Sequence, residues 1–160
     1  MENINDTSKW KVIYQDNSSD VYIYTEPCDR SMHQQGIYLC AVYNTTSNKP
    51  YSGLITYDSH LLEFDDYVKD FLTYHEVGHI TLNHIKNVSK KRSTLLVILR
   101  AFGICPKIEF EADAFSASIV GKANAKSALI QIIKSKLYMI NKVEILLRWI
   151  ILSLRPIKNY

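Results

Sequence analysis

The sequence His75-Glu76-Val77-Gly78-His79 places two histidines four residues apart, with a glutamate directly after the first. Residues four apart lie on one face of a helix, so both imidazoles can reach a single metal ion. Zinc accepts nitrogen ligands of this kind, and Glu76 is then placed to act as general base on a metal-bound water. The motif predicts a zinc hydrolase site with His75 and His79 as ligands and Glu76 as the base.

A catalytic zinc site needs a third protein ligand and keeps one coordination position open. His84 is one candidate, five residues after His79. If the helix continues, His84 lies about 180° around it from His75 and points away from the metal. We therefore expect His84 to be a capping or surface histidine.

The segment Glu109-Phe-Glu-Ala-Asp113 offers carboxylates instead. On a helix Glu109 and Asp113 share a face, whereas Glu111 points elsewhere. Glu109 as ligand leaves Asp113 one turn further along, where it can accept a hydrogen bond from the ring of His75 and fix its orientation. The spacing favours Glu109 as the third zinc ligand, with Asp113 behind His75.

Both motifs, with their flanking residues, resemble a known family of proteases. The stretches Leu61–Asp65, Phe71–Ile80 and Glu109–Ala117, followed by Gly121 and Ala128-Leu-Ile, are similar to the core of HtpX-like and CAAX-prenyl-endopeptidase-like zinc metallopeptidases. In that family the glutamate that opens the second motif is the third zinc ligand, which corresponds to Glu109. The resemblance covers roughly residues 53–132 and implies a minimal soluble gluzincin with a zincin-like fold.

ImmA/IrrE-type metallopeptidases share the same layout and are the second resemblance. Their pattern usually has Asn at the position of Asp113. This second resemblance implies cleavage of a DNA-binding repressor as an alternative activity.

The elements that must position these residues follow from the hydrophobic pattern. Four segments rich in β-branched and aromatic residues predict strands in residues 1–62: Lys11–Tyr14, Val21–Tyr24, Gly36–Tyr43 and Gly53–Tyr57. Short polar turns between them favour a small antiparallel-rich sheet. The prediction is one α+β metallopeptidase domain over residues 1–160, with the sheet packed on the motif helix and several helices after it.

Three helical regions are expected. The motif helix covers 65–85, and the third-ligand helix covers 107–120, after Pro106 and before Gly121. Basic and apolar residues then fill one or two helices over 124–155. A further apolar run, 94–104, predicts another buried helix, with a lip beside the cleft as the alternative.

A substrate-binding strand is also expected. Gluzincin-like enzymes hold an extended peptide against an edge strand beside the active-site helix, and strand addition of this kind uses the backbone. Gly53, Leu54, Ile55, Thr56 and Tyr57 are the candidate. The alternative is that they form an interior strand.

Composition and charge indicate the cellular environment in which we expect this protein. Three scattered cysteines and no CxxC pair favour reduced thiols, and the N-terminus has no signal-peptide pattern, so we expect a cytoplasmic protein. The net charge of +3 conceals an acidic half, −7 over residues 1–85, and a basic half, +10 over 86–160.

The basic helices at the C-terminal end leave three interpretations open. The first is packing on the core with a solvated basic face, the second is contact with an anionic membrane surface, and the third is contact with a partner or nucleic acid. No nucleic-acid motif supports the last of these.

Taken together, the residues predict a zinc-dependent endopeptidase with one Zn²⁺ per chain and a peptide or protein substrate. The alternative is a catalytically silent zinc-site protein that binds or regulates a partner. The intact Glu76 argues against that alternative, since a purely structural zinc site has no use for the base.

Overall fold

A four-stranded sheet and four α-helices form the part of the chain that the computed structural model describes, residues 6–28, 39–43, 49, 51–84, 107–135 and 142–156. For 39–43 only the backbone is described. The elements are β1 (Trp10–Gln15), β2 (Ser19–Tyr24), β3 (Leu39–Tyr43), β4 (Tyr51–Tyr57), α1 (Asp66–Thr81), α3 (Lys107–Val120), α4 (Lys122–Lys134) and α5 (Lys142–Leu154). The predicted α+β class is confirmed.

The sheet is mixed rather than wholly antiparallel. Its strand order is β1-β2-β4-β3, with antiparallel pairs β1–β2 and β3–β4 and a parallel pair β2–β4. Although β3 precedes β4 in the sequence, β4 lies between β2 and β3 in the sheet. The expectation of antiparallel pairing is correct for two of the three pairs and wrong for the central one.

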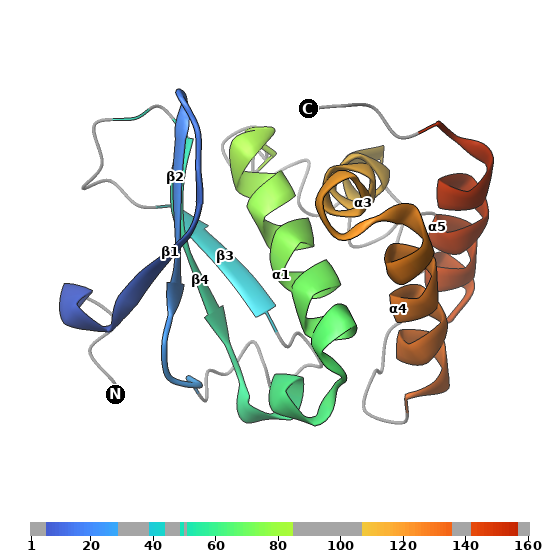
Figure 1. The fold of residues 1–160 in the computed structure, drawn as a ribbon, viewed down its shortest axis with the longest axis horizontal. Helices are drawn as coiled ribbons and strands as arrows, with labels where there is room; N and C mark the ends of the chain where they lie inside the picture. Colours follow the sequence, from blue (N-terminus) through green and yellow to red (C-terminus); the bar gives the residue numbers. More distant parts are fainter. Residues whose placement is uncertain are drawn as a thin grey trace, which may run out of the picture.

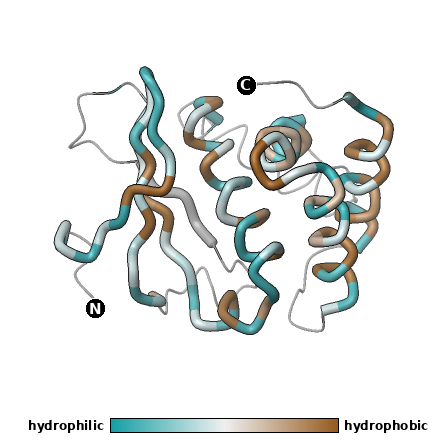
Figure 2. Tube along the Cα trace, viewed as in Figure 1, coloured by the Kyte–Doolittle hydropathy of each residue, from teal (hydrophilic) through white to brown (hydrophobic). Residues whose placement is uncertain are grey.

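Helix α1 is the central layer of the described fold. In Figure 1 it lies between the sheet on one side and α3, α4 and α5 on the other. Its buried residues point to both sides, and the tube in Figure 2 alternates between hydrophobic and hydrophilic along it. They are Val68, Phe71, Leu72, His75, Val77, Gly78 and Ile80. Enclosure by two layers explains how α1 can carry a histidine into the interior.

Close approach of α3 to α1 depends on Gly78. A Cβ atom at this position would lie 3.1 Å from the Cα of Ala112 and 3.2 Å from the Cβ of Phe115. Both neighbours belong to α3, and neither atom can rotate away. Further along, the hydroxyl of Ser116 donates to the carbonyl of Phe71 at 2.8 Å. The two helices are therefore held together through small residues and a buried hydrogen bond.

The C-terminal end of α1 is a Schellman motif. The amide of His84 donates to the carbonyl of His79, and the amide of Asn83 donates to that of Ile80. Asn83 has φ 58, the left-handed conformation that this motif requires. Asn is the residue that most often replaces Gly there. The predicted end of the helix at 85 is wrong, because the chain leaves the helix after Thr81.

The helices after α1 begin and end near the predicted positions. Helix α3 matches the predicted 107–120, and Gly121, at φ 88, separates it from α4. The predicted 124–155 region is two helices, α4 and α5. The predicted helix at 94–104 lies outside the described residues. Within the described parts of the chain, no helix has the length and apolar character needed to cross a bilayer.

Candidate metal centre

Three potential metal ligands meet where α1 and α3 cross. His75 and His79 lie one turn apart on α1, and Glu109 reaches them from the first turn of α3. One ligand atom from each residue lies within 4.8 Å of the other two. His75 and Glu109 are buried and His79 is partly buried. This group could hold a metal ion.

The spacing of the three ligand atoms fits a single small ion. The Nε2 atoms of His75 and His79 are 3.0 Å apart. Glu109 places one carboxylate oxygen 3.2 Å from Nε2 of His75 and the other 3.7 Å from Nε2 of His79. Ligands about 2.1 Å from a tetrahedral ion are separated by about 3.4 Å. Two imidazoles with one carboxylate suit zinc or a related transition metal better than magnesium or calcium.

Charge at this cluster is concentrated on buried groups. Burial and the nearby Arg148 act to lower the pKa of His75, but hydrogen bonds to Asp113 and Glu109 outweigh them and raise it to about 9. Burial acts to raise the pKa of Glu109, but the hydrogen bond from His75 and the nearby ring of His79 hold it well below the ordinary value. Without a metal, a proton on His75 balances the carboxylate, and metal binding at such a site releases that proton.

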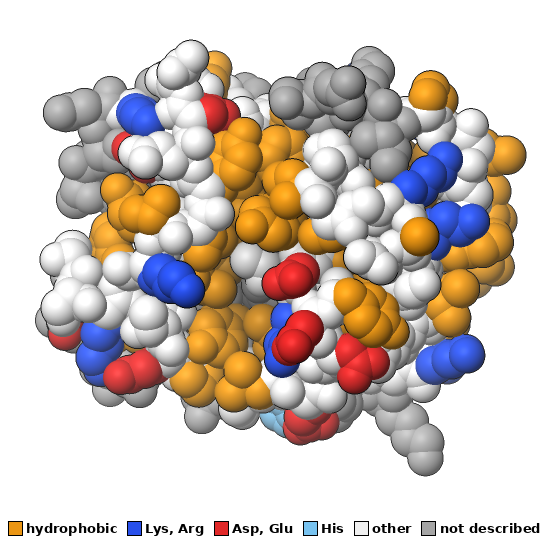
Figure 3. Space-filling model, in the orientation of Figure 1, with side chains coloured by type: hydrophobic (Ala, Val, Ile, Leu, Met, Phe, Trp, Pro, Cys, Tyr) orange, Lys and Arg blue, Asp and Glu red, His pale blue; other side chains and the backbone are white. Residues whose placement is uncertain are grey.

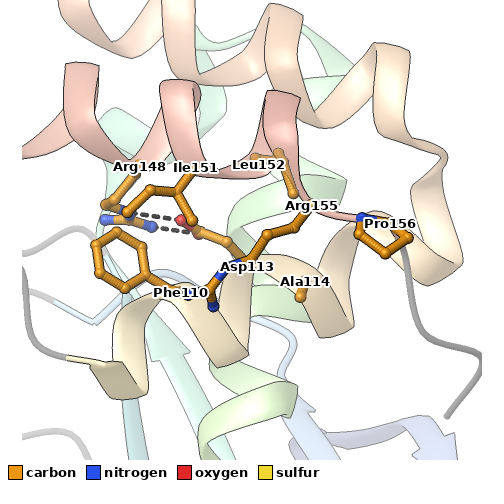
Figure 4. A pocket seen from close by; sticks show the side chains of 8 residues that line it. All are labelled: Phe110, Asp113, Ala114, Arg148, Ile151, Leu152, Arg155 and Pro156. Atoms are coloured by element: carbon orange, nitrogen blue, oxygen red, sulfur yellow. Dashed lines mark hydrogen bonds and ion pairs between the residues drawn. The ribbon is translucent and has the colours of Figure 1, made fainter.

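The ring of His75 is supported from behind by an ion pair. Its Nδ1 lies 2.9 Å from Oδ1 of Asp113. Arg148 of α5 donates to both oxygens of Asp113, with Nε at 2.7 Å and Nη2 at 2.6 Å, as the dashed lines in Figure 4 show. Burial acts to raise the pKa of Asp113, but Arg148 and His75 keep it below its ordinary value. Asp113 therefore lies behind His75, at the place that the sequence predicts.

The ring of His79 is supported by residues for which the sequence predicts no such role. Its Nδ1 lies 3.0 Å from Nδ1 of His84, and Nε2 of His84 lies 3.2 Å from Oε2 of Glu111. Burial and the neighbouring His79 lower the pKa of His84. The expectation of a capping or surface histidine is wrong, because the left-handed residue Asn83 turns the chain back and buries His84 against His79.

The predicted base, Glu76, lies on α1 beside His75. Its side chain is partly exposed, unlike the neighbouring His75. A carboxylate in this position stays open to water while the adjacent histidine points into the interior. The helix crossing therefore offers three potential ligands, and Glu76 follows the first of them in the sequence.

The predicted substrate strand is not at an edge. Gly53, Leu54, Ile55, Thr56 and Tyr57 belong to β4, which pairs with β2 on one side and with β3 on the other. Its backbone hydrogen bonds are used within the sheet, so the expectation of strand addition at these residues is wrong. Among the described strands, β3 is the outer neighbour of β4 and also contacts α1.

Two signals in the sequence point to the groups that the motif analysis misses. Asn83, placed where α1 could end, is a typical residue for a left-handed helix stop, and such a stop returns the following residue to the helix. Arg148 lies within the strongly apolar stretch 145–152. An arginine in such a stretch indicates a buried partner rather than a solvated face.

Comparison with known proteins adds no relative. No family model matches the chain, and neither the curated proteins nor the solved structures include a significant match.

Proposed function

We propose that this protein is a zinc-dependent endopeptidase of the gluzincin type, with a zincin-like fold. The observation that carries the proposal is the group formed by His75, His79 and Glu109, with Glu76 next to the first histidine. Three protein ligands leave the fourth position open, as in catalytic rather than structural zinc sites. The chain has no CxxC pair that would suggest a structural site instead.

His75, His79 and Glu109 would hold the zinc, which when bound lowers the pKa of water to about 7 and polarises a carbonyl group. Glu76 takes the proton of the attacking water on a carboxylate oxygen and passes it to the leaving nitrogen. Arg148 and Asp113 keep the ring of His75 in place during this transfer.

The substrate backbone has one suitable strand to pair with in the described part of the sheet. β3 is the edge strand on the side of β4, and it lies against α1. An extended peptide added to β3 receives backbone hydrogen bonds and runs beside the helix that carries Glu76. We therefore assign substrate binding to β3 in place of Gly53–Tyr57.

The proposal is tested by metal content and turnover together. Elemental analysis of the purified protein is expected to give about one zinc per chain. Glu109→Ala is expected to lose most of it, whereas Glu76→Gln keeps it. With an unstructured protein such as casein as substrate, wild-type protein cleaves, and Glu76→Gln is expected to lose a factor of about 10²–10⁴ in rate.

The two measurements separate the possible failures. Absence of zinc from protein purified with zinc supplied would overturn the metal site. Bound zinc without cleavage of any peptide or protein would favour the catalytically silent alternative. Cleavage confined to a single DNA-binding repressor would favour the ImmA-like activity.

A further inference from the structure

We propose that His84 and Glu111 are positioning residues that fix the ring of His79 for metal binding. The inference deepens the proposed function and rests on it. It assigns a second support to the metal centre, independent of the Asp113–Arg148 pair behind His75. Each of the two histidines on α1 would then have its own carboxylate-based support, one from each side of α3.

The backbone places His84 through a helix stop. In the Schellman motif at the end of α1, His79 occupies the third position from the helix end and His84 the second position beyond it. A contact between these two positions is usual in the motif, where it is commonly hydrophobic. Here two imidazoles make it, with ring centroids 5.2 Å apart. The same turn that ends the helix therefore brings the second ring to the first.

Hydrogen-bond direction follows from the carboxylate of Glu111. An ionised carboxylate only accepts, so Nε2 of His84 carries the hydrogen that it donates to Oε2 at 3.2 Å. In a neutral ring the other nitrogen, Nδ1, is then an acceptor. Nδ1 of His79, at 3.0 Å, must be the donor. His79 is thereby left with an unprotonated Nε2, the atom that faces His75 and Glu109.

Glu111 also faces a lysine on its solvent side. Lys107, one turn earlier on α3, lies 3.1 Å from Oε1, the oxygen that does not face His84. The side chain of Lys107 is 82% exposed and that of Glu111 35% exposed. An exposed ion pair of this kind contributes little energy. We therefore place the support of His79 in His84 and Glu111, and treat Lys107 as a control position.

The experiment measures zinc affinity by competition with a chromophoric chelator. It compares wild type, His84→Ala, Glu111→Gln and the double variant, with circular dichroism of the metal-free proteins to check folding. Loss of such an orienting partner typically weakens metal binding 10–100-fold, so this range is expected for His84→Ala. Because Glu111 acts through His84, the double variant is expected to bind zinc no more weakly than His84→Ala.

Matched variants distinguish loss of the support from His84 and Glu111 from a general disruption of the fold. Lys107→Ala and His60→Ala, which replaces an exposed histidine, should leave the affinity unchanged. His84→Asn keeps an acceptor oxygen near Nδ1 and should recover part of the loss. Asn83→Val, which disfavours the left-handed turn that places His84, should weaken binding.

A second readout needs no metal. Nitrogen NMR of the imidazole rings in the metal-free protein should show His79 with its hydrogen on Nδ1, and His84→Ala should shift the ring toward the other tautomer. Unaltered zinc affinity in both His84→Ala and Glu111→Gln would overturn the inference and leave the proposed function standing. Failure of the wild type to bind zinc would overturn both.

Discussion

Arg148 and Asp113 form a buried bidentate ion pair that joins α5 to α3. Nε and Nη2 of Arg148 lie 2.7 and 2.6 Å from the two oxygens of Asp113. A third nitrogen of the same guanidinium, Nη1, lies 3.8 Å from Glu109. One arginine from the last described helix therefore contacts both Asp113 and Glu109. This contact makes α5 part of the candidate metal centre.

We expect removal of Arg148 to destabilise the fold strongly. Arg148→Met leaves the carboxylate of Asp113 buried without its cation, and breaking a buried pair in this way costs about 3–5 kcal/mol. Urea unfolding of the metal-free protein measures the loss. Arg155→Met, at an exposed position near the end of α5, is the matched control and should change the free energy of unfolding by less than about 0.5 kcal/mol. Equal effects of the two variants would contradict a structural role for the pair.

The metal-centre residues could be predicted because they depend on periodicity within a helix. His75 with His79, and Glu109 with Asp113, are each four residues apart, and four residues return to the same face of a helix. The support around them depends on other features. His84 reaches His79 only because the helix stops at Asn83, and Arg148 reaches Asp113 only because α5 packs on α3. Tertiary packing of this kind leaves no periodic signal within either helix.

The interior position of β4 in the sheet is a second feature that could not be predicted from the sequence. Strand segments are recognisable from their β-branched and aromatic residues, and all four predicted segments overlap observed strands. The order of strands in the sheet depends on where a connection passes, and residues 53–57 have the same composition at an edge as in the interior. Val21 and Ile55, both fully buried in neighbouring parallel strands, indicate the interior position only after the pairing is known.

Gly78 offers a test of the helix crossing. In an exposed helix, Gly→Ala stabilises by about 1 kcal/mol. Here the added methyl group would meet the backbone of Ala112 at 3.1 Å, so α3 must move away and carry Glu109 with it. We expect Gly78→Ala to weaken zinc binding at least 10-fold. We also expect that it does not increase the free energy of unfolding, whereas the same change does so in an exposed helix. A higher melting temperature together with wild-type zinc affinity would show that the crossing is not tight.

The turn between β1 and β2 should respond to acid through Asp16. Burial acts to raise the pKa of Asp16, but hydrogen bonds from Ser18, Ser19 and Tyr14 hold it below the ordinary 3.8. A depressed pKa stabilises the fold above the unfolded-state value, and this stabilisation is lost as the pH falls through the folded-state value. Compared with Asp16→Ala, the wild type should be more stable by about 1 kcal/mol at pH 6.

The stability difference between these two proteins should shrink as the pH is lowered below 3.8. Urea unfolding of both at several pH values from 6 down to 3 measures it. Because the comparison is between two proteins at the same pH, acid effects on other groups cancel. A difference that stays constant across this range would mean that the hydrogen bonds to Asp16 do not depend on its charge.

The outer face of α5 is apolar, whereas its inner face carries Arg148 and Glu144, both buried. The exposed residues follow helical spacing and are Val143, Leu146, Leu147, Ile150 and Leu154. Figure 3 shows Lys and Arg side chains beside hydrophobic ones on the side of the molecule formed by α4 and α5. Within the described residues of these two helices the single carboxylate is that of Glu144, at 3% exposure. An exposed apolar stripe on a pair of helices whose solvent-accessible charges are all positive is complementary to an anionic lipid surface.

We therefore expect this face of α5 to bind anionic membranes. Wild-type protein should float with vesicles of phosphatidylcholine and phosphatidylglycerol at low salt, and much less with phosphatidylcholine alone or at 1 M salt, where charge attraction is screened. The double change Leu146→Glu and Ile150→Glu should abolish flotation, because it adds negative charge and removes apolar contact. Leu62→Glu, at an exposed leucine outside α4 and α5, is the control and should float as wild type does. If the wild type does not float, a membrane does not cover this face. The same conclusion follows if the protein forms a dimer without lipid and the double change dissociates that dimer.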